Sequence, residues 1–178
     1  QALHVGKMPP ALPVLQATLD ISLVEAGFLL SAVQMAGMVL GLAVGLSADS
    51  WGLRRTLLTG LMVLSFASMA GGFVTQASNL LLLRASEGLG FLLVVMPAPG
   101  LIRRSVTVAQ LSGRMGWWGT YMPAGSALAM LIGPWVIAEA NWSVWWWVMG
   151  LVSACAGLAV WGCVPDTSVD APAPQGQA

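Results

Sequence analysis

Apolar residues dominate the chain in long blocks, which short polar stretches separate. Five blocks hold about 20 predominantly apolar residues each, the number that a helix needs to cross a bilayer. They are residues 23–46, 56–73, 80–101, 115–138 and 144–164. An apolar stretch over residues 1–15 is too short to span, and we interpret it as the end of a helix that begins upstream. The pattern predicts an all-α, polytopic transmembrane bundle of about six helices, the first one truncated, over residues 1–164.

Positive and negative residues lie on opposite sides of the predicted membrane. Connections are expected at residues 48–55, 74–79, 102–114 and 139–143. Arginines occupy alternate connections, and acids lie on the opposite side. The arginines are Arg54, Arg55, Arg103, Arg104 and Arg114, and the acids are Asp20, Glu25 and Glu139. By the positive-inside rule the arginine-rich connections are cytoplasmic, which predicts a multi-pass protein of the plasma or inner membrane. Residues 165–178, rich in Pro, Ala, Gln and Asp, are expected to form a polar cytoplasmic loop or tail.

Tryptophans concentrate where the predicted spans meet the membrane surface. Four of them, Trp142, Trp145, Trp146 and Trp147, cluster where the last span would enter from the outer side. We interpret the cluster as part of the aromatic belt at the headgroups. An aromatic box for a substrate is the other interpretation that the residues allow.

Composition narrows the function classes. Only 8% of the 178 residues are charged and the net charge is zero, whereas soluble domains carry about 25% charge. A soluble enzyme and a nucleic-acid partner are therefore not expected. Cys155 and Cys163 are eight residues apart, roughly 12 Å on a helix, too far for a disulfide. No nucleophile–base pair or Cys/His cluster suggests catalysis, a metal or a cofactor, and Gly88-Leu89-Gly90 follows no strand, unlike a nucleotide motif.

One connection carries a motif. Residues 45–55 read GLSADSWGLRR, and this resembles the loop motif of the major facilitator superfamily, a Gly, an Asp four residues on, then Gly and paired basic residues. Ser50 and Leu53 stand where the family has basic residues. Gly45 would allow close approach of a neighbouring backbone, Asp49 could accept hydrogen bonds from a helix N-terminus or pair with Arg54, and Gly52 would allow a tight turn. The resemblance implies a gating role for Gly45, Asp49, Gly52, Arg54 and Arg55.

Two further stretches resemble motifs of the same superfamily. Arg84-Ala-Ser-Glu87-Gly88 resembles its fourth-helix motif, with Glu87 in place of the usual Gln. Residues 125–134 resemble a Gly/Pro-rich motif of antiporters but lack several of its glycines, so antiport is not inferred. Gly133 and Pro134 predict a bend or a loosened hydrogen-bond ladder. Residues 6–13 and 98–104, with the Glu87 motif, look most like the cyanate and nitroimidazole transporter group.

The resemblance implies the N-terminal six-helix half of a transporter, with a missing C-terminal half as its partner and the substrate site between them. It implies secondary active transport by alternating access in the lipid bilayer, with protons as a candidate coupling ion for symport. The alternative is a fragment or half-bundle that acts as a structural or interaction subunit of the membrane without transport of its own.

Ionisable groups inside a bilayer are costly and mark candidate sites. Lys7 and Glu87 are each expected roughly 12 Å deep, with Arg84 one turn from Glu87 on the same face. The resemblance implies that the helices of these residues line a central cavity, so that Lys7, Arg84 and Glu87 would surround one polar spot. Two positive charges and one negative there favour a small polar, anionic substrate. His4, Gln34 and Tyr121 complete the predicted substrate-binding set. The structural alternative is that Arg84 reaches the interface, Lys7 pairs with Glu87 only for stability, and Gln34 packs helices.

Overall fold

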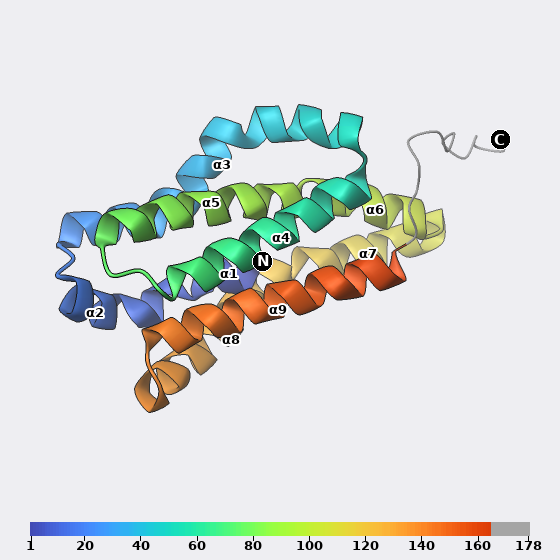
Figure 1. Cartoon of the computed structure of the whole chain (residues 1–178). Helices are drawn as coiled ribbons and strands as arrows, with labels where there is room; N and C mark the ends of the chain where they lie inside the picture. Colours follow the sequence, from blue (N-terminus) through green and yellow to red (C-terminus); the bar gives the residue numbers. More distant parts are fainter. Residues whose placement is uncertain (165–178) are drawn as a thin grey trace.

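Residues 1–164 are described by a computed structural model, apart from the side chains of residues 36, 42, 43 and 45–50. This part of the chain forms helices and no strand, as predicted. The helical segments are α1 Ala2–Gly6, α2 Met8–Leu19, α3 Leu23–Trp51, α4 Leu53–Gly71, α5 Ala77–Val95, α6 Pro97–Ser105, α7 Val108–Gly119, α8 Tyr121–Glu139 and α9 Trp142–Cys163. The residues between α1 and α2, between α5 and α6 and between α7 and α8 keep helical backbone angles, whereas Gly52 turns the chain between α3 and α4. The described residues therefore form six rods (Figure 1).

Prolines explain two of the three interruptions. Pro9 and Pro10 follow the break at Lys7, and Pro97 follows the break at Met96. Proline has no N–H, so the turn before it loses helical hydrogen bonds. Lys7 and Met96 nonetheless keep helical φ and ψ, so each rod continues past its break. The sequence blocks did not predict the third interruption, at Thr120.

Two connections are shorter than expected. The stretch 48–55 was expected to be a loop, but α3 continues to Trp51 and α4 begins at Leu53. The turn rests on Gly52, whose φ of 89° lies in the left-handed region that favours glycine. The expected connection 102–114 shrinks to residues 106–107. Arg103 and Arg104 lie in the last turn of α6, where the helix dipole favours positive charge, and Arg114 lies inside α7.

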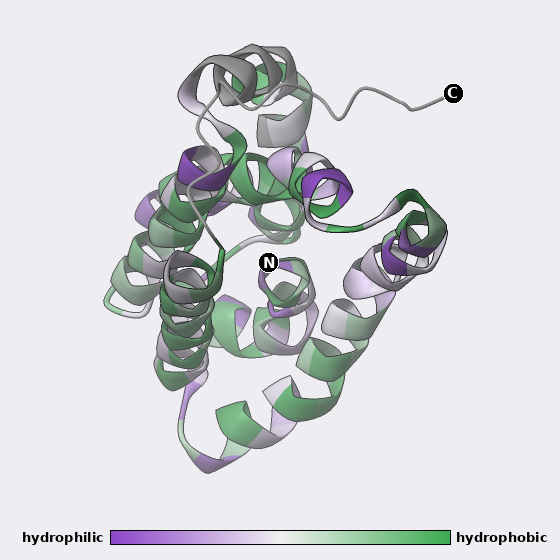
Figure 2. Ribbon diagram, turned by 90° about the vertical axis from the view of Figure 1, so that its right-hand side faces the viewer, coloured by the Kyte–Doolittle hydropathy of each residue, from purple (hydrophilic) through white to green (hydrophobic). Residues whose placement is uncertain are grey.

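Four rods or parts of rods are long and apolar enough to cross a membrane, within the part of the chain that the structure describes. They are Leu23–Gly41, Ala77–Ser105, Val108–Glu139 and Trp142–Cys163. Figure 2 shows the rods nearly end-on, with hydrophobic positions on most sides of them. These features, with the all-helical architecture, confirm the predicted multi-pass membrane bundle.

The rods run antiparallel and enclose the N-terminal rod. The α4 helix packs against α5 and α9, α3 packs against α5, and α1 packs against α8. The chain start lies in the middle of the bundle (Figures 1 and 2). Figure 1 shows one end of the bundle formed by the start of α4 and the ends of α6 and α9, so Arg54, Arg103 and Arg104 lie at this end. At the opposite end, Asp20 follows α2 and Glu139 is the last residue of α8.

Glycines set the closest crossing of α4 and α5. A Cβ at Gly60 would lie 2.8 Å from the Gly90 carbonyl oxygen, and one at Gly90 would lie 3.0 Å from the Gly60 oxygen. Backbone this close leaves no room for a side chain, which is the role of small residues between membrane helices.

Gly60→Ala is therefore expected to destabilise the protein by about 1–3 kcal/mol, the usual cost of overpacking. Gly27→Ala is the matched control, because nothing lies within 4 Å of its Cβ position. Alanine favours helix over glycine, so this control should be neutral or slightly stabilising. Thermal unfolding of the purified full-length protein measures both, and equal effects would contradict the close crossing.

Candidate functional site

Lys7 is the centre of a buried polar cluster. It sits at the break between α1 and α2, and its side chain has no exposed surface. The ammonium donates to Glu87 Oε1, to Ser68 Oγ at 2.9 Å, and toward His4 Nδ1 at 3.5 Å. It also lies 4.5 Å from the centroid of the Trp146 ring, within cation–π distance. All three ammonium donors thus have an acceptor from α1, α4 or α5.

Arg84 occupies the other side of the same carboxylate. One guanidinium nitrogen donates to Glu87 Oε2 at 2.6 Å and to the His4 carbonyl at 2.8 Å. Its Nε faces the Leu29 carbonyl of α3 at 3.5 Å. Residues three apart on a helix share a face, which explains how α5 supplies both Arg84 and Glu87. The two oxygens of one carboxylate therefore hold two cations.

His4 links the cluster to α9. Its Nε2 and Ser153 Oγ form a hydrogen bond of 2.7 Å, and its Nδ1 lies 3.6 Å from Glu87 Oε1. Ser68 in turn donates to the Trp146 carbonyl at 2.8 Å, and the Trp145 indole donates to the Lys7 carbonyl at 3.1 Å. We name His4, Lys7, Ser68, Arg84, Glu87 and Ser153 the charge cluster. Its side chains come from four rods, and Arg84 links them to a fifth rod, α3, at the Leu29 carbonyl.

The structure brings together four of the six residues predicted to bind substrate: His4, Lys7, Arg84 and Glu87. None of the four lies on the surface of an open cavity, because each side chain is at most 2% exposed. Arg84 is buried and does not reach the surface of the bundle. Because α2 continues to Leu19, Lys7 lies about 18 Å along the helix axis from that end, and its depth in the membrane stays a prediction. A substrate-binding role for these residues stays a prediction.

The remaining two predicted residues lie elsewhere. Gln34 of α3 is exposed and lines a cavity of about 300 Å³ together with Val5 of α1, Phe91 of α5 and Met122 of α8. Val5 adjoins His4, and Phe91 lies one helical turn from Glu87, so this cavity borders the charge cluster. Tyr121 is half-buried at the start of α8 and its ring lies 5.1 Å from that of Trp118.

The tryptophan interpretation is wrong for three of the four clustered rings. Trp142, Trp145 and Trp146 are buried rather than at a lipid-facing surface. Glycines of neighbouring helices make the space: a Cβ at Gly71 would lie 2.8 Å from the Trp146 indole nitrogen, and one at Gly133 would lie 3.2 Å from Trp145. Elsewhere Trp51, Trp117, Trp135 and Trp161 are exposed, as a belt requires.

The residues implied in gating are only partly described. Gly45 and Asp49 fall on the end of α3 whose side chains lie outside the described residues. Gly52 makes the turn into α4. Arg54 donates to the Trp161 carbonyl at 2.6 Å, near the end of α9, and Arg55 is exposed. Their part in gating stays a prediction.

The Gly/Pro-rich stretch packs the N-terminal rod. A Cβ at Gly133 would lie 2.8 Å from Pro10, and one at Gly6 would lie 2.8 Å from the Ser126 Cα. The α8 helix is continuous through Gly133 and Pro134, and the rod is interrupted at Thr120. The predicted bend or loosened ladder at Gly133 and Pro134 stays a prediction. The close contact fixes where Lys7 enters the bundle.

Sequence reasoning missed Ser68 and Ser153, and it did not predict that Trp145 and Trp146 contact Lys7. Ser68 and Ser153 lie in apolar stretches that carry no charge between their ends. A signal was present, because a hydroxyl inside a bilayer needs a hydrogen-bond partner. The other side of both helices does face outward, as Phe66 and Leu158 are about 70% exposed, at 73% and 69%.

Ser68→Ala is expected to destabilise the protein by about 1–3 kcal/mol, because it leaves the buried Lys7 ammonium with one acceptor fewer. Ser86→Ala is the control, since the Ser86 hydroxyl bonds back to the Leu82 carbonyl of its own helix. Thermal unfolding compares the two variants. A Ser86→Ala loss as large as that of Ser68→Ala would show that Ser68 does not support Lys7.

Comparison with known proteins gives the family. The family model described as Major Facilitator Superfamily matches residues 5–178. The chain belongs to this superfamily. A similar protein is the puromycin resistance protein of Streptomyces alboniger, 29% identical over 154 residues, which are 86% of this chain and 30% of that protein.

These matches bear on the extent of the chain and on its subgroup within the superfamily. It spans less than a third of the length of the puromycin resistance protein. They support the superfamily and not the cyanate and nitroimidazole group, which residues 6–13 and 98–104 and the Glu87 motif suggested. Superfamily membership points to a transporter rather than an enzyme.

Proposed function

We propose that the complete protein is a secondary active transporter that moves a small polar, anionic solute across the plasma or inner membrane by alternating access. Superfamily membership supports the transport mechanism. The single observation that carries the choice of solute is the excess of buried positive charge. Lys7 and Arg84 share one carboxylate, so the charge cluster has a formal charge of +1 with His4 neutral.

The excess charge acts on the cavity beside Gln34 through one layer of helix. A helix with its side chains is about 10 Å across. At that distance and an effective dielectric constant near 20, a unit charge stabilises an anion by about 1.7 kcal/mol. This exceeds the roughly 1.4 kcal/mol of a tenfold ratio, so we expect a preference of at least about tenfold over a neutral analogue. In the cavity wall, the Gln34 amide can donate and accept hydrogen bonds, which suits a polar solute.

Glu87 has a second role in the proposal. Its two oxygens hold Lys7 and Arg84, and it is the acid of the cluster. Protonation of Glu87 would release both cations and raise the local positive charge, so proton-coupled symport would link proton binding to anion binding. The segment from Gly45 to Arg55 would gate the cytoplasmic end, where the arginines gather.

Uptake by the full-length protein in proteoliposomes tests this proposal. The panel holds small carboxylates and phosphates, neutral analogues and puromycin, each with and without an inward proton gradient. We expect anions to enter faster than neutral analogues, and the gradient to accelerate them. Puromycin uptake that exceeds every anion would overturn the anionic solute, and gradient-independent rates would overturn proton symport. Empty liposomes and a protein with both gating arginines replaced by Gln are the controls.

A further inference from the structure

The cavity beside Gln34 has a wall that is almost wholly apolar. Gln34 supplies the one polar side chain among the described residues that line its volume of about 300 Å³. The rest of the lining is apolar and includes the ring of Phe91 and the thioethers of Met38 and Met122. The Gln34 amide makes no hydrogen bond to any residue that the structure describes, so it is available to a solute.

The charge cluster lies at one end of this cavity. Leu29 of α3 accepts a hydrogen bond from Arg84, and the cavity begins one turn further along α3, at Val33. On α5, Phe91 likewise follows Glu87 by one turn. The positive charge therefore acts on the cavity from one end, and the other end has only apolar walls.

The cluster supplies charge to the cavity but no contact surface. Its side chains are buried, and all three donors of the Lys7 ammonium already have acceptors. A nitrate or phosphate ion carries oxygens on every side and would lose its hydration against an apolar wall without replacement. The Gln34 amide has two N–H donors, as many as one carboxylate has oxygens. These walls therefore favour an anion whose charge is confined to one group.

We propose that the solute is a monocarboxylate with a compact apolar body. Its carboxylate lies beside Gln34, and its ring or branched chain lies against Phe91 and the two methionines. This inference rests on the proposed function, because it takes the cavity as the solute site. The volume is at the lower end for a ligand pocket, which suits a single ring, and methionine side chains adapt to its shape. Each buried methylene group adds about fourfold in affinity.

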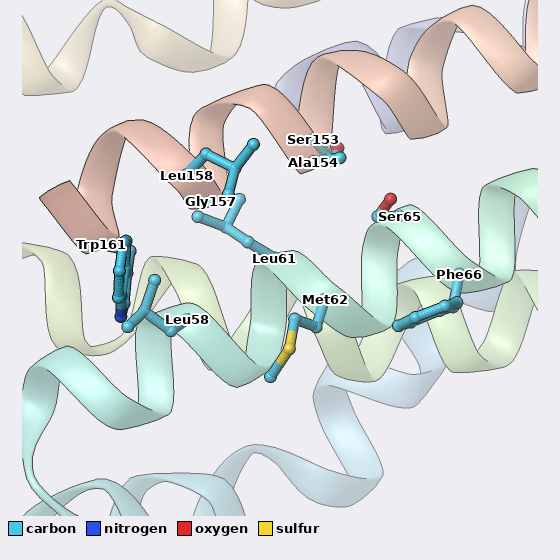
Figure 3. Close-up of a pocket in the computed structure, with 10 residues that line it drawn as sticks. All are labelled: Leu58, Leu61, Met62, Ser65, Phe66, Ser153, Ala154, Gly157, Leu158 and Trp161. Carbon is cyan, nitrogen blue, oxygen red and sulfur yellow. The ribbon is translucent and has the colours of Figure 1, made fainter.

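A larger apolar groove lies between α4 and α9, and we name it the α4–α9 groove. Its volume is about 580 Å³, and it shares no lining residue with the cavity. Figure 3 shows its two walls, with Trp161 at one end and Ser65 and Ser153 at the other. Both hydroxyls are engaged, because Ser65 donates to the Gly150 carbonyl at 2.9 Å and Ser153 bonds to His4. The groove therefore serves as the control for apolar binding outside the cavity.

Calorimetric titration of the full-length protein in nanodiscs tests the proposal with four probes: benzoate, acetate, benzamide and acetamide. Benzoate should bind at least about tenfold more tightly than acetate, because its ring buries more apolar surface. Equal affinities of these two, or no binding of benzoate, would overturn the apolar contact and leave an anionic solute possible. Benzamide that binds as tightly as benzoate would instead overturn the anionic solute of the proposed function.

Two matched variants locate the binding. A Cβ at Gly37 in the cavity would have Leu92 Cδ2 as its nearest neighbour at 3.7 Å, and one at Gly157 in the α4–α9 groove would have Leu61 Cβ at 3.7 Å. Gly37→Leu should weaken benzoate binding by about fivefold or more and acetate binding less, because it fills the space for the ring. Gly157→Leu should change neither. Equal effects of the two variants, or the reverse order, would overturn the site.

A second pair of variants decides the matter if Gly37→Leu does not fold. Met122→Asn places a polar group in the cavity wall and should weaken benzoate binding severalfold, with acetate unchanged. Met130→Asn, on the same helix at a position that is 55% exposed and outside the cavity, should have no effect. Benzoate binding that is unchanged in Met122→Asn would contradict contact between the apolar body and this wall.

Discussion

Glu87→Gln is expected to destabilise the full-length protein by about 3–5 kcal/mol, the cost of leaving buried charge without its partner. The carboxylate of Glu87 holds both Lys7 and Arg84, and all three side chains are at most 1% exposed. Glutamine has nearly the same shape, so the loss would come from charge and not from a cavity. The apparent melting temperature in detergent should fall by several degrees.

A second substitution distinguishes two causes of the stability loss, the uncompensated charge and the lost hydrogen bonds. Adding Lys7→Met to Glu87→Gln removes one of the two uncompensated cations and should recover part of the lost stability. Each single variant loses hydrogen bonds, so a model based on contacts alone expects the double variant to be the least stable of the three. If the double variant were the least stable of the three, charge balance would not be what stabilises the cluster.

Lys7→Met is the second prediction, and its main effect is on transport. It leaves Arg84 and Glu87 as a neutral pair, so the protein should stay folded, with a stability loss of about 1–2 kcal/mol. The excess positive charge disappears, and with it the field on the cavity beside Gln34. We expect the uptake preference for an anion over its neutral analogue to fall about tenfold.

Lys7→Arg is the control for Lys7→Met. It keeps the positive charge, although the planar guanidinium fits the site of the ammonium imperfectly. The preference for anions should therefore persist even if the overall uptake rate falls. Uptake ratios measured with both variants at equal protein density decide the matter. An unchanged ratio in Lys7→Met would contradict an electrostatic role for Lys7 and favour the structural interpretation of the cluster.

Helix count and site composition follow from the sequence to different degrees. Apolar block lengths predicted the rods, because the cost of exposing backbone to lipid forces such blocks into helices. The three-residue spacing of Arg84 and Glu87 predicted that the two residues share a helix face. Which side of the N-terminal rod Lys7 faces depends on tertiary packing, chiefly at Gly6 against α8, and no local pattern carries that information.

The inward tryptophans show the same limit. Trp145 and Trp146 follow the pattern of a surface belt, and only Gly133 and Gly71 of other rods give them room inside.

The predicted bounds of the connections were wrong for another reason. Low hydropathy predicted loops for the stretches that contain arginine, but arginine also favours helices. Arg103 and Arg104 therefore lie in α6, and Arg114 lies in α7.

The most direct test of the central claim is uptake of a carboxylate and its matching carboxamide, in competition, by the wild-type full-length protein in proteoliposomes. The two solutes have nearly the same size and differ in charge, so their ratio reports the field at the solute site. The excess charge of Lys7 and Arg84 over Glu87 predicts that the carboxylate is preferred about tenfold. Equal uptake of the two, or preference for the carboxamide, would contradict transport of an anion guided by the charge cluster.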